Sequence, residues 1–276
     1  MRAKKSYGQH FLAQPAVAQQ IAEAVDVGGV EQILEVGPGQ GMLTQFLLER
    51  GRPLIAIEAD RDMVSYLHNT FREWATDEHL IAADFLKVDL AAVTDRRPTA
   101  LVGNFPYNIS SQILVRLVDY RDLFPRMVGM FQRELAERVL APPGTRNFGA
   151  ISALVQAFYR GRNVIQVKPG SFNPPPKVDS TVIALERLPE EELPDCNVKI
   201  LRQVIRVAFQ QRRKMLRNSL KPLWTDFDPE EEAMRRRPEQ LQIADFVEIA
   251  RRVEATRARE RTGGTDTWGT DTGTRR

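Results

Sequence analysis

The sequence is poor in the residue types that build disulfide scaffolds and metal centres, and it lacks long hydrophobic runs. Its 276 residues include one cysteine, Cys196, and three histidines, His10, His68 and His79. A lone cysteine excludes an internal disulfide or a cysteine metal cluster and fits a reducing compartment, and with so few histidines we expect no metal. No apolar run approaches the roughly 18 residues of a membrane-spanning helix. Because no apolar signal-peptide core follows the basic segment 1–5, we expect a cytoplasmic protein without a membrane partner.

The net charge of the whole chain is also small, because 39 Lys and Arg nearly balance 36 Asp and Glu. One segment, however, carries a large positive charge. Segment 199–221 holds eight Lys or Arg and no acidic residue. A block of one sign favours a polyanionic partner, and a solvated helix face is the alternative.

Short apolar runs alternate with longer amphipathic segments through the first two-thirds of the chain. This alternation predicts an α/β fold with a Rossmann-like, doubly wound, mostly parallel sheet. The expected strands are 32–36, 54–58, 79–82, 99–103 and 127–131. The expected helices are 42–50, 61–71, 110–119, 132–140 and 149–159. Two later runs, 163–167 and 180–186, fit an antiparallel edge of the sheet.

An acidic stretch with two prolines, 189–194, separates two predicted domains. Residues 1–188 are predicted to form the sheet domain, and residues 195–260 a small all-helical domain. The last residues, 262–276, are rich in Gly, Thr and Asp and lack an apolar period, so we expect a disordered tail.

A glycine-rich loop follows the first predicted strand and opens a helix. Gly37, Gly39 and Gly41 let the backbone turn sharply and let a ligand lie against main-chain atoms, in the usual ligand crevice of an open α/β sheet. A dinucleotide-binding loop has its third glycine one position later, where this chain has Met42. The shorter spacing predicts a nucleoside ligand without a pyrophosphate.

Acidic residues accompany the next two predicted strands. Glu58 ends the second, where a carboxylate can accept hydrogen bonds from both ribose hydroxyls. Asp84 follows the third, where it is placed to accept a hydrogen bond from an adenine amine. Each feature has a plainer alternative: a structural turn for the glycines, a surface acid for Glu58 and a helix N-cap for Asp84. Their occurrence at the ends of successive strands favours a nucleoside-type cofactor.

The tetrapeptide Asn104-Phe105-Pro106-Tyr107 follows the fourth strand and indicates chemistry on an adenine amine. That nitrogen is a poor nucleophile because its lone pair is delocalised into the ring. The side-chain oxygen of Asn104 and a main-chain oxygen before or at Pro106 can accept its two N–H bonds and favour the tetrahedral geometry for attack on a methyl group. Tyr107 can stack on the extruded base. The alternative is a strand-to-turn junction with an aromatic plug.

From residue 9 to about residue 221 the sequence resembles the KsgA-type small-subunit ribosomal RNA adenine dimethyltransferases. The matching segments are Gln9-His10-Phe11-Leu12, Glu35-Val36-Gly37-Pro38-Gly39, Asn104-Phe105-Pro106-Tyr107-Asn108-Ile109-Ser110, Phe172-Asn173-Pro174-Pro175-Pro176-Lys177-Val178-Asp179-Ser180 and Phe209-Gln210-Gln211-Arg212-Arg213-Lys214. The last two discriminate best, because many amine methyltransferases share the others.

The resemblance implies S-adenosylmethionine-dependent dimethylation of the N6 amines of two adjacent adenosines in the 3′-terminal hairpin loop of 16S rRNA, during biogenesis of the small ribosomal subunit. The expected cofactor-binding residues are His10, Leu12, Gly37, Gly39, Glu58, Asp84 and Asn104. The expected catalytic residues are Asn104, Pro106, Tyr107 and Phe172. Phe172 matches an aromatic residue that packs against the target base opposite Tyr107, although on its own it would be a core residue. The family often has Asn at the position of His10 and Leu at that of Phe105.

The basic segment 199–221 is the candidate RNA-binding surface. Helical periodicity puts its apolar residues on one face, with Arg202 and Arg206 at the edge, and Arg213 and Arg217 return to that side if the helix continues. The expected RNA-binding residues are Arg206, Arg212, Arg213, Lys214 and Arg217. We expect a monomer that binds 16S rRNA in the small subunit.

Three other functions share parts of this pattern. A macrolide-resistance-type 23S rRNA adenine methyltransferase would have the same glycine loop and the same tetrapeptide. A DNA adenine or protein glutamine methyltransferase would use similar amide chemistry with a different recognition region. A non-enzymatic ribosome-assembly or transcription factor could retain the fold, and turnover of the cofactor would distinguish it.

Overall fold

The computed structural model describes residues 10–224 and 226–262, with side chains up to residue 260. The basic segment 1–5 lies outside the described residues, as does the expected disordered tail 262–276 except for Thr262, which is helical.

The chain divides into two compact units. The first comprises residues up to 141 together with 154–193, and the second comprises 142–153 together with the residues after 193. On sequence alone we place 142–153 in the sheet domain, but the structure groups them with the helical unit. The physical reason is an aromatic contact, because the buried ring of Phe148 lies 6.0 Å from that of Phe209 in an edge-on arrangement.

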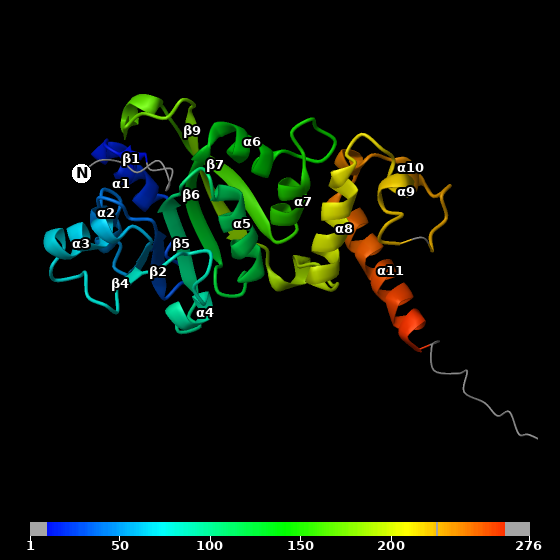
Figure 1. The fold of residues 1–276 in the computed structure, drawn as a ribbon, viewed down its shortest axis with the longest axis horizontal. Coiled ribbons are helices and arrows are strands. Elements are labelled where there is room, and N and C mark those ends of the chain that lie inside the picture. Colours follow the sequence, from blue (N-terminus) through cyan, green and yellow to red (C-terminus); the bar gives the residue numbers. More distant parts are fainter. Residues whose placement is uncertain (1–9, 225, 263–276) are drawn as a thin grey trace, which may run out of the picture. The chain divides into compact units, whose positions relative to one another are not determined.

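A seven-stranded sheet forms the centre of the first unit, in the order β4-β3-β2-β5-β6-β9-β7. Strands β2 to β6 run parallel, and β9 runs antiparallel to both of its neighbours. The predicted α/β, mostly parallel fold class is confirmed, as Figure 1 shows. The strands are β2 (Gln32–Val36), β3 (Leu54–Glu58), β4 (Leu80–Ala82), β5 (Thr99–Asn104), β6 (Arg126–Gln132), β7 (Tyr159–Val167) and β9 (Ser180–Arg187).

Helices connect the strands of this unit. They are α1 (Pro15–Glu23), α2 (Thr44–Leu48), α3 (Arg61–Thr70), α4 (Leu90–Val93), α5 (Ser110–Asp119), α6 (Arg133–Leu140) and α7 (Ala150–Gln156), which straddles the division between units. Helix α1 is not among the predicted elements, although it begins at a proline, a favourable first helical residue, and buries Ala18, Ile21 and Ala22. Also unpredicted is a small antiparallel pair of β1 (Phe11–Leu12) and β8 (Phe172–Asn173), whose partners are distant in sequence.

Phe105 fixes the position of the tetrapeptide by packing against glycine-bearing strands. Its side chain is buried. A Cβ on Gly103 of β5 would lie 2.7 Å from the Phe105 ring, and one on Gly129 of β6 would lie 2.2 Å from it. The bulky ring therefore fits only because both neighbouring strands lack a side chain there, which anchors the end of β5.

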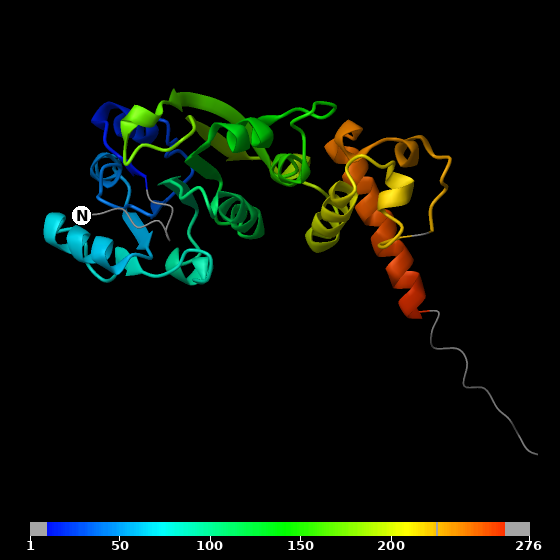
Figure 2. The ribbon, with the colours of Figure 1, turned by 45° about the horizontal axis from the view of Figure 1, so that its top comes forward.

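The second unit is helical. It contains the helices α8 (Val198–Gln210), α9 (Leu216–Ser219), α10 (Glu232–Arg235) and α11 (Ile243–Thr262) and the 3₁₀ turn η4 (Pro238–Gln240). Another 3₁₀ turn, η3 (Glu190–Glu192), precedes α8 in the chain. Asn197 caps α8 by accepting hydrogen bonds from the main-chain N–H groups of Lys199 and Ile200. Figures 1 and 2 both show α8 (yellow) beside α11 (orange to red).

Helix α8 buries the predicted face, including Leu201, Val204, Ile205 and Ala208. The helix ends at Gln210, so the condition under which Arg213 and Arg217 would return to its face is not met. No helix in the described ranges is both long enough and apolar enough to cross a membrane.

Candidate functional site

A cavity of about 500 Å³ opens at the carboxyl ends of β2, β3, β4 and β5. The chain runs from β2 outward through β3 and β4 and then returns to pair β5 with the other side of β2. This reversal leaves a crevice between the loops of β2 and β5, which is where open α/β sheets bind ligands. Of the expected cofactor and catalytic residues, the cavity wall includes His10, Leu12, Gly37, Gly39, Glu58, Asp84, Asn104, Pro106 and Tyr107.

Two of the three glycines in the loop after β2 have clearly different roles. All have positive φ, at 69° for Gly37, 57° for Gly39 and 79° for Gly41, a conformation that favours glycine. A Cβ on Gly37 would meet no atom within 4 Å, so glycine there keeps space free for a ligand. A Cβ on Gly41 would lie 2.3 Å from the Phe71 ring, so the third glycine serves packing against the end of α3.

Glu58 is oriented by two main-chain donors. The N–H of Gly39 donates to its Oε2 at 3.0 Å and the N–H of Asp60 to its Oε1 at 2.9 Å. Burial raises the pKa of Glu58, and these two hydrogen bonds oppose that effect. Each oxygen keeps a lone pair for a further donor, so the carboxylate can receive a pair of ribose hydroxyls.

Glu35 is a cavity residue that sequence reasoning missed. It lies in β2, is 1% exposed, and accepts a hydrogen bond from the hydroxyl of Thr44 at 2.7 Å. Burial raises its pKa to about 8, with a smaller contribution from the charge of Glu58, so the side chain is mostly neutral at pH 7. An acid inside an otherwise apolar strand is the signal that could have identified it.

Asp84 caps a turn rather than a helix, and its contact with an adenine amine stays a prediction. Its Oδ1 accepts the N–H of Leu86 at 2.9 Å, as a helix-capping residue would, and its Oδ2 lies 3.6 Å from the ammonium of Lys87. The same residue lines the cavity, and its side chain is 42% exposed. The turn that it caps therefore presents the carboxylate at the cavity wall.

The amide of Asn104 has a defined orientation. Its Nδ2 donates to the main-chain carbonyl of His10 at 2.9 Å. Because that carbonyl can only accept, the nitrogen must face it, and the oxygen Oδ1 remains as an acceptor for a substrate. The cavity wall thus includes an amide oxygen whose orientation is fixed.

The sequence offers two main-chain oxygens, those of Phe105 and Pro106, as the second acceptor beside the Asn104 oxygen. The structure favours one of them. The carbonyl of Pro106 already accepts the N–H of Ile109 at 3.2 Å and the hydroxyl of Ser110 at 3.0 Å. The carbonyl of Phe105 is left as the available main-chain acceptor of the tetrapeptide.

Tyr107 is held on two sides. Its hydroxyl lies 2.5 Å from the hydroxyl of Ser180, and burial raises its pKa. Its ring lies 5.4 Å from the ring of His10, tilted by 30°. The Nδ1 of His10 lies 2.8 Å from the carbonyl of Pro174, so that nitrogen carries the hydrogen. An aromatic ring fixed in this way is suited to stacking against a base.

Phe172 is the one expected catalytic residue that the structure does not bring to the cavity. It is 4% exposed, pairs with Leu12 through β8 and β1, and belongs to the hydrophobic core. Phe172 is therefore a core residue, and its role against the target base stays a prediction.

The expected RNA-binding residues of the second unit fall into two groups. Arg212 lies 3.9 Å from Glu239 and Arg217 lies 3.2 Å from Glu230, so both have acidic partners. The side chains of Arg206, Arg213 and Lys214 have no hydrogen-bond or ion-pair partner among the described residues, and all three residues are exposed. Within the same ranges, no group of three His, Cys, Asp or Glu residues is arranged to hold a metal.

Comparisons with known proteins agree with this chemistry. The family model described as ribosomal RNA adenine dimethylase matches residues 1–254. A protein of Phocaeicola vulgatus named ribosomal RNA small subunit methyltransferase A is 43% identical over 92% of this chain and 91% of its own. One of the same name from Porphyromonas gingivalis is 44% identical, over 90% and 96% of the two chains. The crystal structure of a dimethyladenosine transferase from Plasmodium falciparum is 27% identical, has a TM-score of 0.74, and matches over 89% of this chain and 98% of that one.

Proposed function

The chain belongs to the ribosomal RNA adenine dimethylase family and is an S-adenosylmethionine-dependent methyltransferase, and from this premise we propose that it dimethylates N6 of two adjacent adenosines in the 3′-terminal hairpin loop of 16S rRNA. It acts on the small ribosomal subunit during its biogenesis, as a cytoplasmic monomer. The observation that carries the proposal is the Asn104 amide, whose nitrogen donates to His10 and so leaves the oxygen to accept, in the wall of a cavity lined by the glycine loop, Glu58 and Asp84.

Residues of this chain fit the cofactor. The open space at Gly37 admits a ligand close to the main chain. The oriented oxygens of Glu58 would hold the ribose, and Asp84 would accept from the adenine amine. When bound, S-adenosylmethionine supplies a methyl group on a sulfonium, a leaving group that needs no activation by a general acid.

The tetrapeptide prepares the target amine. The Asn104 Oδ1 and the carbonyl of Phe105 would accept its two N–H bonds, which favours a pyramidal nitrogen and stabilises the positive charge that develops on it. Tyr107, held by Ser180 and His10, would stack on the base. The proton of the methylated amine can leave to solvent, because that cation is strongly acidic.

The second unit would bind the rRNA backbone. Arg206, Arg213 and Lys214 carry charge that no acid in the described residues neutralises. Such groups are available for phosphates, which position a protein on RNA without specifying a sequence.

Labelled S-adenosylmethionine, offered with unmethylated small subunits, large subunits and DNA, tests the proposal. Mass-spectrometric mapping should locate the label on two adjacent adenines of the small-subunit RNA. Label on large subunits would instead support a 23S rRNA methyltransferase, and label on DNA a DNA methyltransferase. Binding to small subunits without any transfer would support an assembly factor.

A further inference from the structure

Arg116 of α5 connects that helix to the loop after β4. Its Nη1 donates to the carbonyl of Leu86 at 2.7 Å and its Nη2 to the carbonyl of Val88 at 2.5 Å. Its guanidinium also lies over the ring of Phe85, 5.7 Å from the centroid. One side chain thus holds three parts of the loop 84–88.

The loop that Arg116 holds forms one wall of the cofactor cavity. Asp84, Phe85 and Leu86 all line that cavity. The loop is irregular, so no strand ladder or long helix fixes its carbonyls. Two donors in a planar fork suit two nearby carbonyls better than the single ammonium of a lysine would.

Helix α5 gives Arg116 a rigid base. It buries Ile113, Leu114 and Leu117 in the core, and the ring of Tyr120 lies on the guanidinium, 5.1 Å from it. The helix begins at Ser110, shortly after the tetrapeptide that is proposed to hold the target amine. Because α5 packs into the core, its position does not depend on the loop 84–88.

We propose that Arg116 is a positioning residue for the nucleobase of the cofactor, because it keeps the loop 84–88 in the conformation that presents Asp84 and Phe85. The inference rests on the proposed placement of the adenine against Asp84. Loss of the guanidinium should leave two loop carbonyls without their charged donor, which weakens cofactor binding without changing the groups that act on the target amine.

The test compares Arg116→Met with Arg121→Met by calorimetry, using S-adenosylhomocysteine and 5′-methylthioadenosine as ligands. The second ligand has the adenine and ribose but lacks the amino-acid part. Arg116→Met, which removes two charge-assisted hydrogen bonds to the loop, should weaken both by the same factor, about 10-fold or more. In turnover, the KM for S-adenosylmethionine should rise by a similar factor, with kcat within about twofold of wild type.

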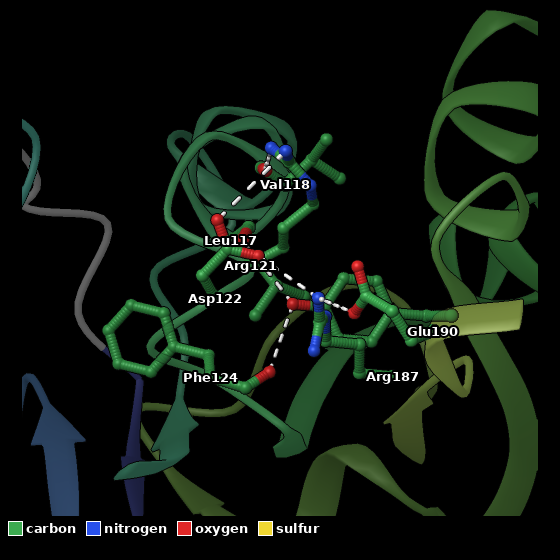
Figure 3. Close-up of polar contacts among 8 residues, drawn as sticks. Leu117, Val118, Arg121, Asp122, Phe124, Arg187 and Glu190 are labelled. Atoms are coloured by element: carbon green, nitrogen blue, oxygen red, sulfur yellow. Dashed lines mark hydrogen bonds and ion pairs between the residues drawn. The ribbon is translucent and has the colours of Figure 1, made fainter. Parts of the chain in front are cut away.

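Arg121 is a matched control in the same region. Its guanidinium lies over the buried ring of Phe158 at 5.1 Å, and it donates to the carbonyl of Val118 at 3.4 Å. Figure 3 shows Arg121 beside Asp122 and Arg187, in a polar group that does not include the loop 84–88. Arg121→Met should leave both affinities unchanged. Hydrogen exchange of amides 85–88 in the unliganded protein should accelerate in Arg116→Met only, and Arg116→Lys should restore part of the affinity.

Asp84→Asn separates failure of this inference from failure of the cofactor placement. Asparagine can still accept the N–H of Leu86 but turns a donor toward the adenine amine. If Asp84→Asn leaves 5′-methylthioadenosine affinity unchanged, the adenine lies elsewhere and the inference falls with its premise. If Asp84→Asn weakens binding while Arg116→Met weakens it no more than Arg121→Met, the placement stands and the role of Arg116 is wrong.

Discussion

The cavity of the first unit and the basic segment of the second differ in how firmly their polar side chains are held by hydrogen bonds and ion pairs. In the cavity, Glu58 receives two main-chain N–H groups, the amide of Asn104 is turned by a carbonyl, and Tyr107 is held by a hydroxyl. In the basic segment, Arg212 and Arg217 are paired with acids, but the side chains of Arg206, Arg213 and Lys214 have no partner within the described residues.

This difference matches two physical tasks. Methyl transfer requires atoms aligned to within fractions of an ångström, so the cavity fixes its groups before any ligand arrives. Binding of a phosphate backbone requires charge that is free to meet it, and fixed geometry adds little. Variants of the two regions should therefore fail in different ways.

The largest effect is expected at Asn104. Asn104→Ala removes an oriented acceptor for the target amine and should lower kcat by about 10²–10³, while cofactor affinity changes much less. Steady-state kinetics and calorimetry measure the two quantities. Gln112→Ala, which removes an exposed amide outside the cavity, is the control. Near-normal dimethylation by Asn104→Ala would refute the mechanism.

The second-largest effect is expected from reversing the unpaired basic charges of the second unit. Converting Arg206, Arg213 and Lys214 to Glu should weaken small-subunit binding broadly and reduce the log–log salt slope by about 0.7–0.9 for each phosphate that is no longer neutralised. Cofactor affinity should stay unchanged. Binding titrations across a salt series measure the slope.

The control for this variant reverses three paired arginines of the same unit, Arg235, Arg236 and Arg252, whose partners are Glu230, Glu232 and Glu231. The net charge changes equally in both variants. If the two salt slopes fall by the same amount, net charge and not the basic segment controls binding.

A smaller loss is expected at Glu58. Glu58→Ala removes the acceptor for the ribose hydroxyls and should weaken cofactor binding about 10-fold or more, with subunit affinity retained. Calorimetry with S-adenosylhomocysteine measures the loss. Glu134→Ala removes an exposed acid of α6 and should have no effect; an equal response of the two variants would make Glu58 an ordinary structural acid.

The smallest effect concerns pH. Because the pKa of Glu35 is raised to about 8 in the folded protein, the folded state holds a proton that the unfolded chain loses at lower pH. The stability contribution of Glu35 is therefore full below the unfolded pKa and is lost as pH rises toward 8, by at most about 1.4 kcal/mol per pH unit. Urea unfolding of wild type and Glu35→Gln between pH 5 and 8 measures this loss: the free energy of unfolding of wild type should fall relative to that of the variant, which cannot titrate at this position, as pH rises. A constant difference would mean that Glu35 ionises normally.

Much of the fold and cavity could be predicted from the sequence because the relevant signals are local. The limits of β2 and β3 agree with the predicted strands, since buried parallel strands are continuous apolar runs bounded by turns. Glu58 and Asn104 were identifiable because polar residues at the carboxyl ends of such strands share one edge of the sheet.

What could not be predicted depends on contacts between distant segments. The pairing of β1 with β8, which places Phe172 beside Leu12, has no local pattern that shows it. The orientation of the Asn104 amide depends on the carbonyl of His10. The packing of 142–153 against the rest of the second unit depends on the contact of Phe148 with Phe209. Each is a tertiary contact without a periodic signature.

Single-turnover methyl transfer at saturating cofactor and saturating small subunits tests the division between the two regions most directly. The account predicts that Asn104→Ala lowers this rate by at least about 10²-fold with unchanged subunit affinity. The variant with Arg206, Arg213 and Lys214 reversed should transfer at a rate within about twofold of wild type once saturated, because its defect lies in binding alone. Equal losses of the saturated rate in both variants would contradict the account.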